Sequence, residues 1–265
     1  HNRYFGCEIE VDNGGELEEN AQQVIDILGS QNCIIKRDGS LTQGFEIVTN
    51  PCSLNYHKQL PYRELFRFLK SKGYRAHDTQ TCGLHIHINR TALGETKSKQ
   101  DLNIAKLSNI LTVCKKEVQA FARRENHYAC YPPSTDGSLF EAYYEMRTIG
   151  KNSALNLLHK DTIEFRVFKG TLNLNTFYMT LDFVNTLIDV VLTLTEKEII
   201  ESDSWDAYES YFSDEIIQYI KERKEKEATN TQNTYSTNEP TLDYSPTHLF
   251  FSSRELTTPQ ISLNS

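Results

Sequence analysis

Five short segments of the chain have the hydrophobic pattern of β-strands. Residues 3–12 and 162–168 alternate apolar and polar side chains, as expected for a strand with one buried face. Two shorter segments flank the turn-forming sequence Asp38-Gly39-Ser40. The remaining segment, residues 84–89, contains two histidines. The predicted strands are residues 3–12, 33–36, 45–49, 84–89 and 162–168.

Other segments repeat their apolar residues at helical spacing. In residues 16–28, Leu17, Ala21, Val24 and Leu28 share one stripe, and Gly29 follows as a helix-ending residue. The same argument predicts helices over residues 61–72, 101–123, 175–194 and 205–227. Because strands and helices interleave irregularly, we expect an α+β fold with an antiparallel or mixed sheet.

The character of the chain changes after residue 227. Residues 228–265 are rich in Thr, Asn, Ser, Gln and Pro, and their one apolar island is Leu249-Phe250-Phe251. Such a composition buries too little apolar surface to offset the entropy of ordering a chain. We therefore expect a folded domain over residues 1–227 and a polar, disordered tail over residues 228–265.

Composition and charge exclude several classes of protein. The chain has 265 residues with 28 Lys and Arg against 36 Asp and Glu, which gives a net charge of -8. This acid excess argues against a nucleic-acid partner, which needs a basic face. The longest apolar-leaning stretch, residues 183–194, is too short and too polar for a membrane span. We expect a protein with neither a nucleic-acid nor a membrane partner.

The cysteines carry information on compartment. None of the six cysteines is paired as Cys-x-x-Cys, which argues against a zinc ribbon or a thioredoxin-like motif. The chain does not open on a secretory signal, so we expect free thiols and a cytoplasmic location.

Functional side chains recur two residues apart on the predicted strands. Residues i and i+2 of a strand point to the same face, and the intervening residue in each pair is apolar. The pairs are Glu8 with Glu10, His85 with His87, and Glu164 with Arg166, and a single Glu46 lies between apolar neighbours in the same way.

Two interpretations of these side chains are open. One is an ordinary solvated sheet face, and the other is a single cavity lined by carboxylates, imidazoles and a guanidinium. Lys, Thr and Ser, which usually fill a wet face, are absent from these positions. Carboxylates with imidazoles suit Mg²⁺ or Mn²⁺ bound with a phosphate substrate, and an Arg beside them can fork onto phosphate oxygens.

The motifs resemble those of the amidoligase family of phages and bacteria, which is related to glutamine synthetase and the glutamate–cysteine ligases. They occur in the order of that family and span residues 5–172. The matching segments are Phe5-Gly-Cys-Glu-Ile-Glu10, Asp38-Gly-Ser-Leu41, Gly44-Phe-Glu-Ile-Val-Thr49, Cys82-Gly-Leu-His-Ile-His-Ile88 and Glu164-Phe-Arg-Val-Phe-Lys-Gly-Thr-Leu172.

The resemblance implies a glutamine-synthetase-like sheet funnel with helices on its outer face, and a role for each matching residue. His87 would contact the nucleotide phosphates, and Arg166 the phosphate or acyl phosphate, so these two and Glu164 would be catalytic. The implied metal ligands are Glu8, Glu10, Glu46, His85 and Glu164.

The resemblance also implies roles for residues outside the paired motifs. Arg123, Arg124 and Lys169 are candidate phosphate contacts, and the motif does not say which arginine matters. Asp38, Ser40 and Tyr128 are candidate substrate contacts, although Asp38 also suits an ordinary Asx turn. For the isolated histidines we expect surface or core positions; they are His57, His77, His127 and His159.

The expected function is therefore ATP-dependent joining of a carboxylate to an amine through an acyl phosphate, with Mg²⁺ or Mn²⁺. The substrates would be small molecules or peptides, while the oligomeric state has no signature in the sequence. The chain lacks the N-terminal subdomain and the recognisable ammonia-site residues of glutamine synthetase, so ammonia is not the expected amine. The alternatives are a metal-dependent hydrolase built on the His85/His87 strand and a non-catalytic nucleotide-binding module.

Overall fold

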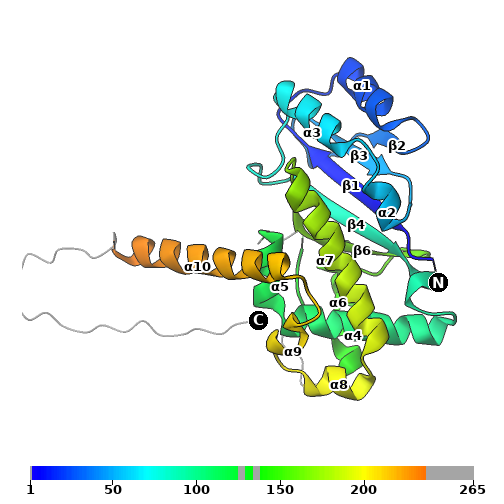
Figure 1. Ribbon diagram of the computed structural model, residues 1–265, viewed down its shortest axis with the longest axis vertical. Helices are drawn as coiled ribbons and strands as arrows, with labels where there is room; N and C mark the ends of the chain where they lie inside the picture. The colour runs from blue at the N-terminus through cyan, green and yellow to red at the C-terminus, as the bar shows by residue number, and fades with distance from the viewer. Residues whose placement is uncertain (1, 125–128, 134–137, 237–265) are drawn as a thin grey trace, which may run out of the picture. The chain divides into compact units, whose positions relative to one another are not determined.

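The computed structural model describes residues 2–124, 129–133 and 138–236. Its strands form one open six-stranded sheet in the order β2-β3-β1-β4-β6-β5, with every neighbouring pair antiparallel (Figure 1). The α+β class is thereby confirmed. The strands are β1 Phe5–Val11, β2 Cys33–Lys36, β3 Phe45–Thr49, β4 Gly83–Asn89, β5 Leu155–Asn156 and β6 Thr162–Lys169.

Helices make up most of the remaining described chain. The predicted helix over residues 101–123 is divided at Cys114, whose φ of -92° and ψ of 23° interrupt it, into α4 and α5. The α-helices are α1 Glu18–Leu28, α2 Leu54–His57, α3 Tyr62–Ser71, α4 Lys97–Val113, α5 Lys115–Ala122, α6 Leu139–Ile149, α7 Leu174–Thr193, α8 Glu196–Glu201, α9 Asp206–Glu209 and α10 Asp214–Ser236. The 3₁₀ turns are η1 Arg90–Leu93 and η2 Gly150–Asn152.

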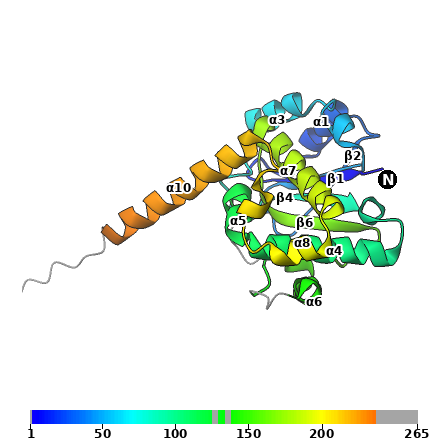
Figure 2. The same cartoon turned by 60° about the horizontal axis from the view of Figure 1, so that its bottom comes forward.

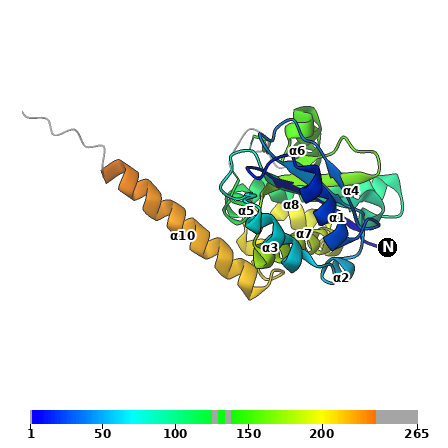
Figure 3. The same cartoon turned by 90° about the horizontal axis from the view of Figure 1, so that it is seen from above.

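One face of the sheet forms the hydrophobic core. Phe5, Cys7, Ile9 and Val11 of β1 are all buried, as the alternation predicts. Helices α3 and α7 lie on one side of the sheet and α6 on the other (Figures 2 and 3). Aromatic side chains tie the covering helices to one another, with the rings of Tyr62 and Phe177 centred 4.5 Å apart and those of Phe121 and Phe183 4.2 Å apart.

A β-bulge changes the phase of β6. Leu84 of β4 pairs with Phe168, whereas Ile86 pairs with Phe165. Between these two pairs β6 therefore contains one residue more than β4. As a result Phe165 and Phe168 are both buried in the core. Arg166, between them, lies on the other face with Glu164.

The secondary structure just after the predicted domain boundary differs from the disordered tail expected there. The contacts divide the chain into residues 1–226 and 227–265, and α10 is helical through this division to Ser236. The first residues assigned to the polar tail are therefore helical, and the rest of that tail, from residue 237, lies outside the described residues. No helix in the described parts of the chain combines the length and apolar character that crossing a membrane requires.

Candidate active site

The strand register brings the paired motifs together on the face opposite α3 and α7. Glu8 is directly opposite His85, and Glu10 is directly opposite Glu46. His87 is opposite Glu164 across the next pair of strands. Directly opposed residues of an antiparallel sheet share a face. The four adjacent strands β3, β1, β4 and β6 thus place the predicted acidic and histidine side chains on one surface together with Arg166. These side chains are Glu8, Glu10, Glu46, His85, His87 and Glu164.

His85 is at the centre of this surface. Its Nδ1 lies 3.1 Å from Oε2 of Glu8 and 3.4 Å from Oε1 of Glu164, and its Nε2 lies 3.9 Å from Oε1 of Glu10. The side chains of His85, Glu10 and Glu164 are almost completely buried. Three carboxylates from two other strands therefore surround one imidazole out of bulk solvent.

The carboxylates of Glu8 and Glu46 differ in their affinity for protons. Burial works to raise the pKa of Glu8, but contacts with His85 and His87 outweigh it and hold the pKa far below its usual range. Burial raises the pKa of Glu46 to about 8, and the neighbouring Glu8 charge adds to this effect. Like-charged carboxylates in one site share a proton in this way unless a cation separates them.

Glu164 presents its two oxygens to different partners. Oε1 faces Nη1 of Arg166 at 2.5 Å, whereas Oε2 faces His159 Nε2 at 2.9 Å and accepts a hydrogen bond from Asn156 Nδ2 at 2.7 Å. Burial works to raise the pKa of Glu164, but the charges of His85 and Arg166 keep it below its usual value. Glu164 is therefore held as a carboxylate.

Of the two neighbouring arginines, Arg124 is the one at the site. Its buried guanidinium lies 3.3 Å from Nε2 of His85 and donates to the carbonyl oxygens of Thr81 and Arg166. A Cβ at Gly83 would lie only 2.3 Å from Arg124 Nη1, so the absence of a side chain there makes room for it. Arg123 instead donates to the carbonyl oxygen of Lys169.

The loop between β2 and β3 contributes to a cavity of about 360 Å³ beside this surface. Oδ1 of Asp38 accepts a hydrogen bond from the backbone N–H of Ser40, which is an Asx turn, and its carboxylate also groups with those of Glu10 and Glu46. The Asx turn expected for Asp38 is therefore present, and its carboxylate lies beside those of Glu10 and Glu46. The cavity is lined by Glu10, Asp38, Ser40, Thr81, Arg124, Lys151, Asn152 and Arg166.

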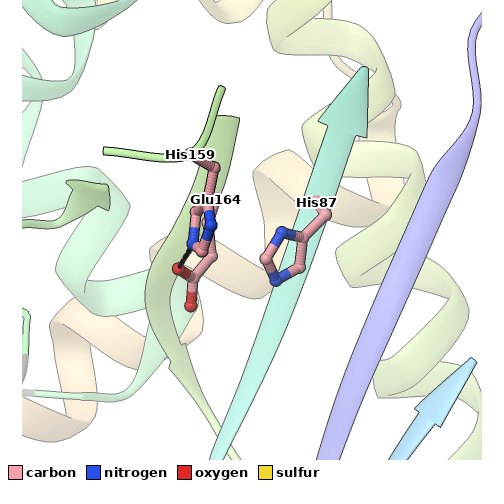
Figure 4. A group of neighbouring side chains, drawn as sticks. All are labelled: His87, His159 and Glu164. Carbon is pink, nitrogen blue, oxygen red and sulfur yellow. Dashed lines mark hydrogen bonds and ion pairs between the residues drawn. The ribbon is translucent and has the colours of Figure 1, made fainter. Parts of the chain in front are cut away.

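His159 belongs to the site, contrary to the surface or core role expected for it. Figure 4 shows its imidazole beside the Glu164 carboxylate, with His87 facing the pair from β4. The rings of His87 and His159 are centred 5.2 Å apart. A single histidine in the turn between β5 and β6 has no partner at i+2, so periodicity gave no signal for it.

The remaining candidates either lie outside the described residues or make their contacts elsewhere. Tyr128 and His127 lie outside the described residues. Lys169 pairs with Gly83 at the end of β6, and the contact recorded for it is through its carbonyl oxygen. His57 is a core residue, as expected, with its ring nitrogens bonded to Tyr62 and to the backbone of Phe5.

Among the described residues, three groups of side chains have the spacing of a metal site. In each group, one possible ligand atom per residue lies within 4.8 Å of the others. Two groups consist of carboxylates with at most one imidazole, which is the donor set of a hard divalent ion, and the third has two imidazoles. The groups are Glu8 with Glu46 and His85, Glu10 with Asp38 and Glu46, and His87 with His159 and Glu164.

Comparison with known proteins assigns much of this surface to a family. Residues 6–130 match the family model described as "Putative amidoligase enzyme", while no curated protein matched the chain. The matched range contains the E-x-E and H-x-H strands and Arg124, and it ends before Glu164 and Arg166. The family resemblance of the motifs is thereby confirmed, and it indicates a ligase-type enzyme. Residues 6–130, a little under half of the chain, are thus similar to the amidoligase family.

Proposed function

We propose that the protein is an ATP-dependent carboxylate–amine ligase that requires Mg²⁺ and forms an amide or isopeptide bond through an acyl phosphate. One observation carries the proposal: five residues from four strands, all with metal-binding side chains, converge on one buried surface beside a cavity. They are Glu8, Glu10, Glu46, His85 and Glu164.

The chemistry of these residues fits divalent ions. Glu46 and Glu8 are close enough to share a proton, which raises the pKa of Glu46 to about 8 after the larger effect of burial. A divalent ion in place of that proton would satisfy both carboxylates. Glu8, Glu46 and His85 would hold one ion, and Glu10 with Asp38 and Glu46 another. Bound Mg²⁺ would offset the charge of the ATP phosphates and of the transferring phosphoryl group.

Two arginines of the chain place positive charge beside the proposed metal ligands. Arg166 and Arg124 both line the cavity, next to Glu10. Guanidinium groups bind phosphate and carboxylate oxygens through paired N–H donors. In the proposed reaction they orient the γ-phosphoryl group and the substrate carboxylate for in-line attack, and His87 contacts the phosphates. The surrounding strands hold these donors in place before the substrate arrives, which lowers the reorganisation cost.

The residues that line the cavity also indicate the class of substrate. Lys151 and Asn152 line it opposite the strand residues, with Asp38 and Ser40 from the β2–β3 loop. A cation, an amide and a hydroxyl are suited to an acidic or peptide-like carboxylate substrate and its amine partner. We propose small molecules or peptides as both substrates, and a cytoplasmic reaction, where ATP and Mg²⁺ are available.

Hydroxylamine is the sharpest first probe, because it is a general amine acceptor that converts an acyl phosphate into a stable hydroxamate. The full chain is incubated with Mg²⁺, ATP, hydroxylamine and a panel of carboxylic acids, and ADP and hydroxamate are both measured. We expect the two products to form in equal amounts with the correct acid, and no ADP formation above background without one.

A matched pair of variants tests the residue assignment. Glu10→Gln removes one negative charge at the buried surface and should lower ADP formation by about 100-fold or more. Glu18→Gln makes the same change on the exposed side of α1 and should have no effect. Equal activity of both variants would refute the site.

The two alternatives predict different products. A metal-dependent hydrolase would cleave an ester or phosphoester without ATP, and this cleavage would depend on His85 and His87. A nucleotide-binding module would bind ATP without releasing ADP with any acid. Either result would replace the ligase proposal.

A further inference from the structure

His87, His159 and Glu164 form a group of metal-binding side chains that neither the paired motifs nor the family match brings together. One ring nitrogen from each histidine and one Glu164 oxygen lie within 4.8 Å of one another (Figure 4). Only His87 lies in the matched range of residues 6–130. His159 comes from the turn between β5 and β6, so three separate segments supply the three donors.

The spacing of the donor atoms suits a single ion. Nε2 of His159 is 2.9 Å from Oε2 of Glu164. Ligand atoms that share a tetrahedral ion at ordinary bond lengths lie about 3.3 Å apart. Small rotations of these side chains are therefore enough to place a nitrogen or oxygen donor on each of three corners.

Hydrogen bonds from outside the group hold the Glu164 carboxylate in place. Asn156 donates from Nδ2 to Oε2 of Glu164 at 2.7 Å, and its Oδ1 accepts from the backbone N–H of Leu158 at 3.0 Å. Hydrogen bonds of this kind orient the ligands of metal sites and contribute to affinity. The turn that carries His159 is thus tied to the carboxylate it faces.

The donor set differs from the rest of the surface. The group around Glu10 is all carboxylate, whereas this one has two imidazoles and one carboxylate. Two histidines with one carboxylate select borderline transition ions such as Zn²⁺, while Mg²⁺ prefers oxygen ligands. The His159 side chain is 46% exposed, which leaves one side of the group open to water or substrate.

We propose that His87, His159 and Glu164 bind a transition-metal ion of the Zn²⁺ type, at a position next to the carboxylate-rich ones, because Nε2 of His87 also lies 3.1 Å from Oε1 of Glu8. The Glu164 carboxylate lies between the two regions, with Oε2 toward His159 and Oε1 toward Arg166 and His85. An ion at this position has a ready-made set of three protein ligands and an open coordination position. The proposal concerns binding alone and stands whether or not the protein is a ligase.

The test is a Zn²⁺ titration of the full chain by calorimetry in excess Mg²⁺, which occupies the positions that prefer oxygen ligands. We expect one tight Zn²⁺ site. His159→Ala should weaken it at least about 10-fold, and Asn156→Ala should weaken it within about 10–100-fold. His77→Ala removes another exposed histidine and should leave the affinity unchanged.

A second measurement separates ligation from a loss of folding. His159→Cys keeps a side chain that binds Zn²⁺ but disfavours Mg²⁺, so it should restore tight Zn²⁺ binding. Substitution of Co²⁺ should give visible absorption bands in the original protein that change in His159→Cys, because the thiolate replaces a nitrogen.

Two outcomes would overturn the proposal. One is Zn²⁺ affinity that is the same in His159→Ala as in the original protein. The other is Zn²⁺ binding that disappears in Glu10→Gln and persists in His159→Ala, which would place the ion among the carboxylates. Failure of the ligase proposal has a different signature, namely the absence of acid-dependent ADP formation with Zn²⁺ binding intact.

Discussion

Nη1 of Arg124 lies 3.3 Å from Nε2 of His85, while the other ring nitrogen of His85 faces Glu8 Oε2 at 3.1 Å. A guanidinium has only donors, so in a neutral imidazole a hydrogen bond from Arg124 requires Nε2 to accept and leaves the ring proton on Nδ1, which faces Glu8. Nη1 of Arg166 lies 3.5 Å from the same Nδ1, so the two arginines face opposite nitrogens of this ring. Arg124 and Arg166 both line the cavity beside this ring.

The two neighbouring arginines provide a matched comparison. Arg124→Lys keeps the positive charge but loses the fork that reaches His85 and three backbone carbonyls, so we expect acid-dependent ADP formation to fall by about 10²-fold. Arg123→Lys should change this rate by less than about threefold, because Arg123 contacts the carbonyl of Lys169 instead. Steady-state kinetics should show the Arg124 effect in kcat more than in KM for ATP. Equal effects of the two substitutions would contradict the assignment.

Gly44 is expected to be intolerant of any side chain. A Cβ there would lie 1.8 Å from the carbonyl oxygen of Val11 and 2.7 Å from Cα of Asp12, and neither backbone atom can rotate away. We expect Gly44→Ala to lower the free energy of unfolding by about 1–3 kcal/mol or more in urea denaturation.

Gly39 is the control for this prediction. It lies five residues earlier in the same loop, and a Cβ there would meet nothing within 4 Å. Gly39→Ala should change the free energy of unfolding by less than about 0.5 kcal/mol. A similar loss of stability in both variants would show that the close approach to Val11 is not the cause.

The buried histidine of α2 predicts a pH dependence of stability. His57 is fully buried; burial lowers the pKa of His57, and the hydrogen bond to the Phe5 carbonyl opposes this only in part. The unfolded chain takes up a proton at this histidine near pH 6.5 and the folded one does not, so unfolding is favoured as the pH falls below about 6.5. One such group contributes a slope of at most about 1.4 kcal/mol per pH unit.

Variants can show whether His57 causes this pH dependence of the free energy of unfolding. Urea denaturation between pH 7.5 and pH 5.5 should show a smaller loss of stability with acidification in His57→Gln than in the original protein. The exposed His77→Gln should keep the original slope, because solvent hydrates its ring in both states. Identical slopes in all three proteins would exclude His57 as the source.

The thiols should be slow to react in the folded protein. The six cysteines form no disulfide in the structure. Burial, with a smaller contribution from Glu117, raises the pKa of Cys114 to about 12, and burial raises the pKa of Cys52 to about 11. Since the thiolate is the reactive form, Ellman's reagent at pH 8 should modify these two slowly.

Denaturation supplies the reference for this measurement. In guanidinium chloride the same reagent should count six thiols at once. Cys114→Ser should leave the fast phase of the folded protein unchanged, and loss of a fast-reacting thiol in that variant would contradict the burial of Cys114.

Much of this fold follows from short-range patterns, and the exceptions have identifiable causes. Alternation located β1 and β6 and the residues that share a face, because period two is a local property of a strand. It gave no sign of β5, since Leu155–Asn156 is too short to show a period. The helix break at Cys114 was also missed, because the apolar stripe continues across it into α5.

The composition of the candidate site was predictable only where strands carry it. The E-x-E, H-x-H and E-x-R pairs can be recognised in the sequence by their spacing of two residues. The pairing register of the strands then determines which of these side chains are neighbours. His159, Lys151 and Asn152 reach the same region from a loop and a turn. Their positions depend on how the chain between α6 and β6 folds back, and no local pattern encodes that.

The bulge in β6 determines which residues this strand can offer to a substrate. Without it, simple alternation after Glu164 and Arg166 would send Phe168 to the polar face and Lys169 into the core. With it, Phe168 stays in the core and Lys169, paired with Gly83, follows Arg166 on the polar side. The extra residue thus shifts the inward and outward alternation of the side chains that follow it by one position. Removing Val167 would take out the extra residue, and plain alternation would then keep Phe168 in the core and Lys169 on the polar side, so the bulge is what lets the longer strand keep both of its faces.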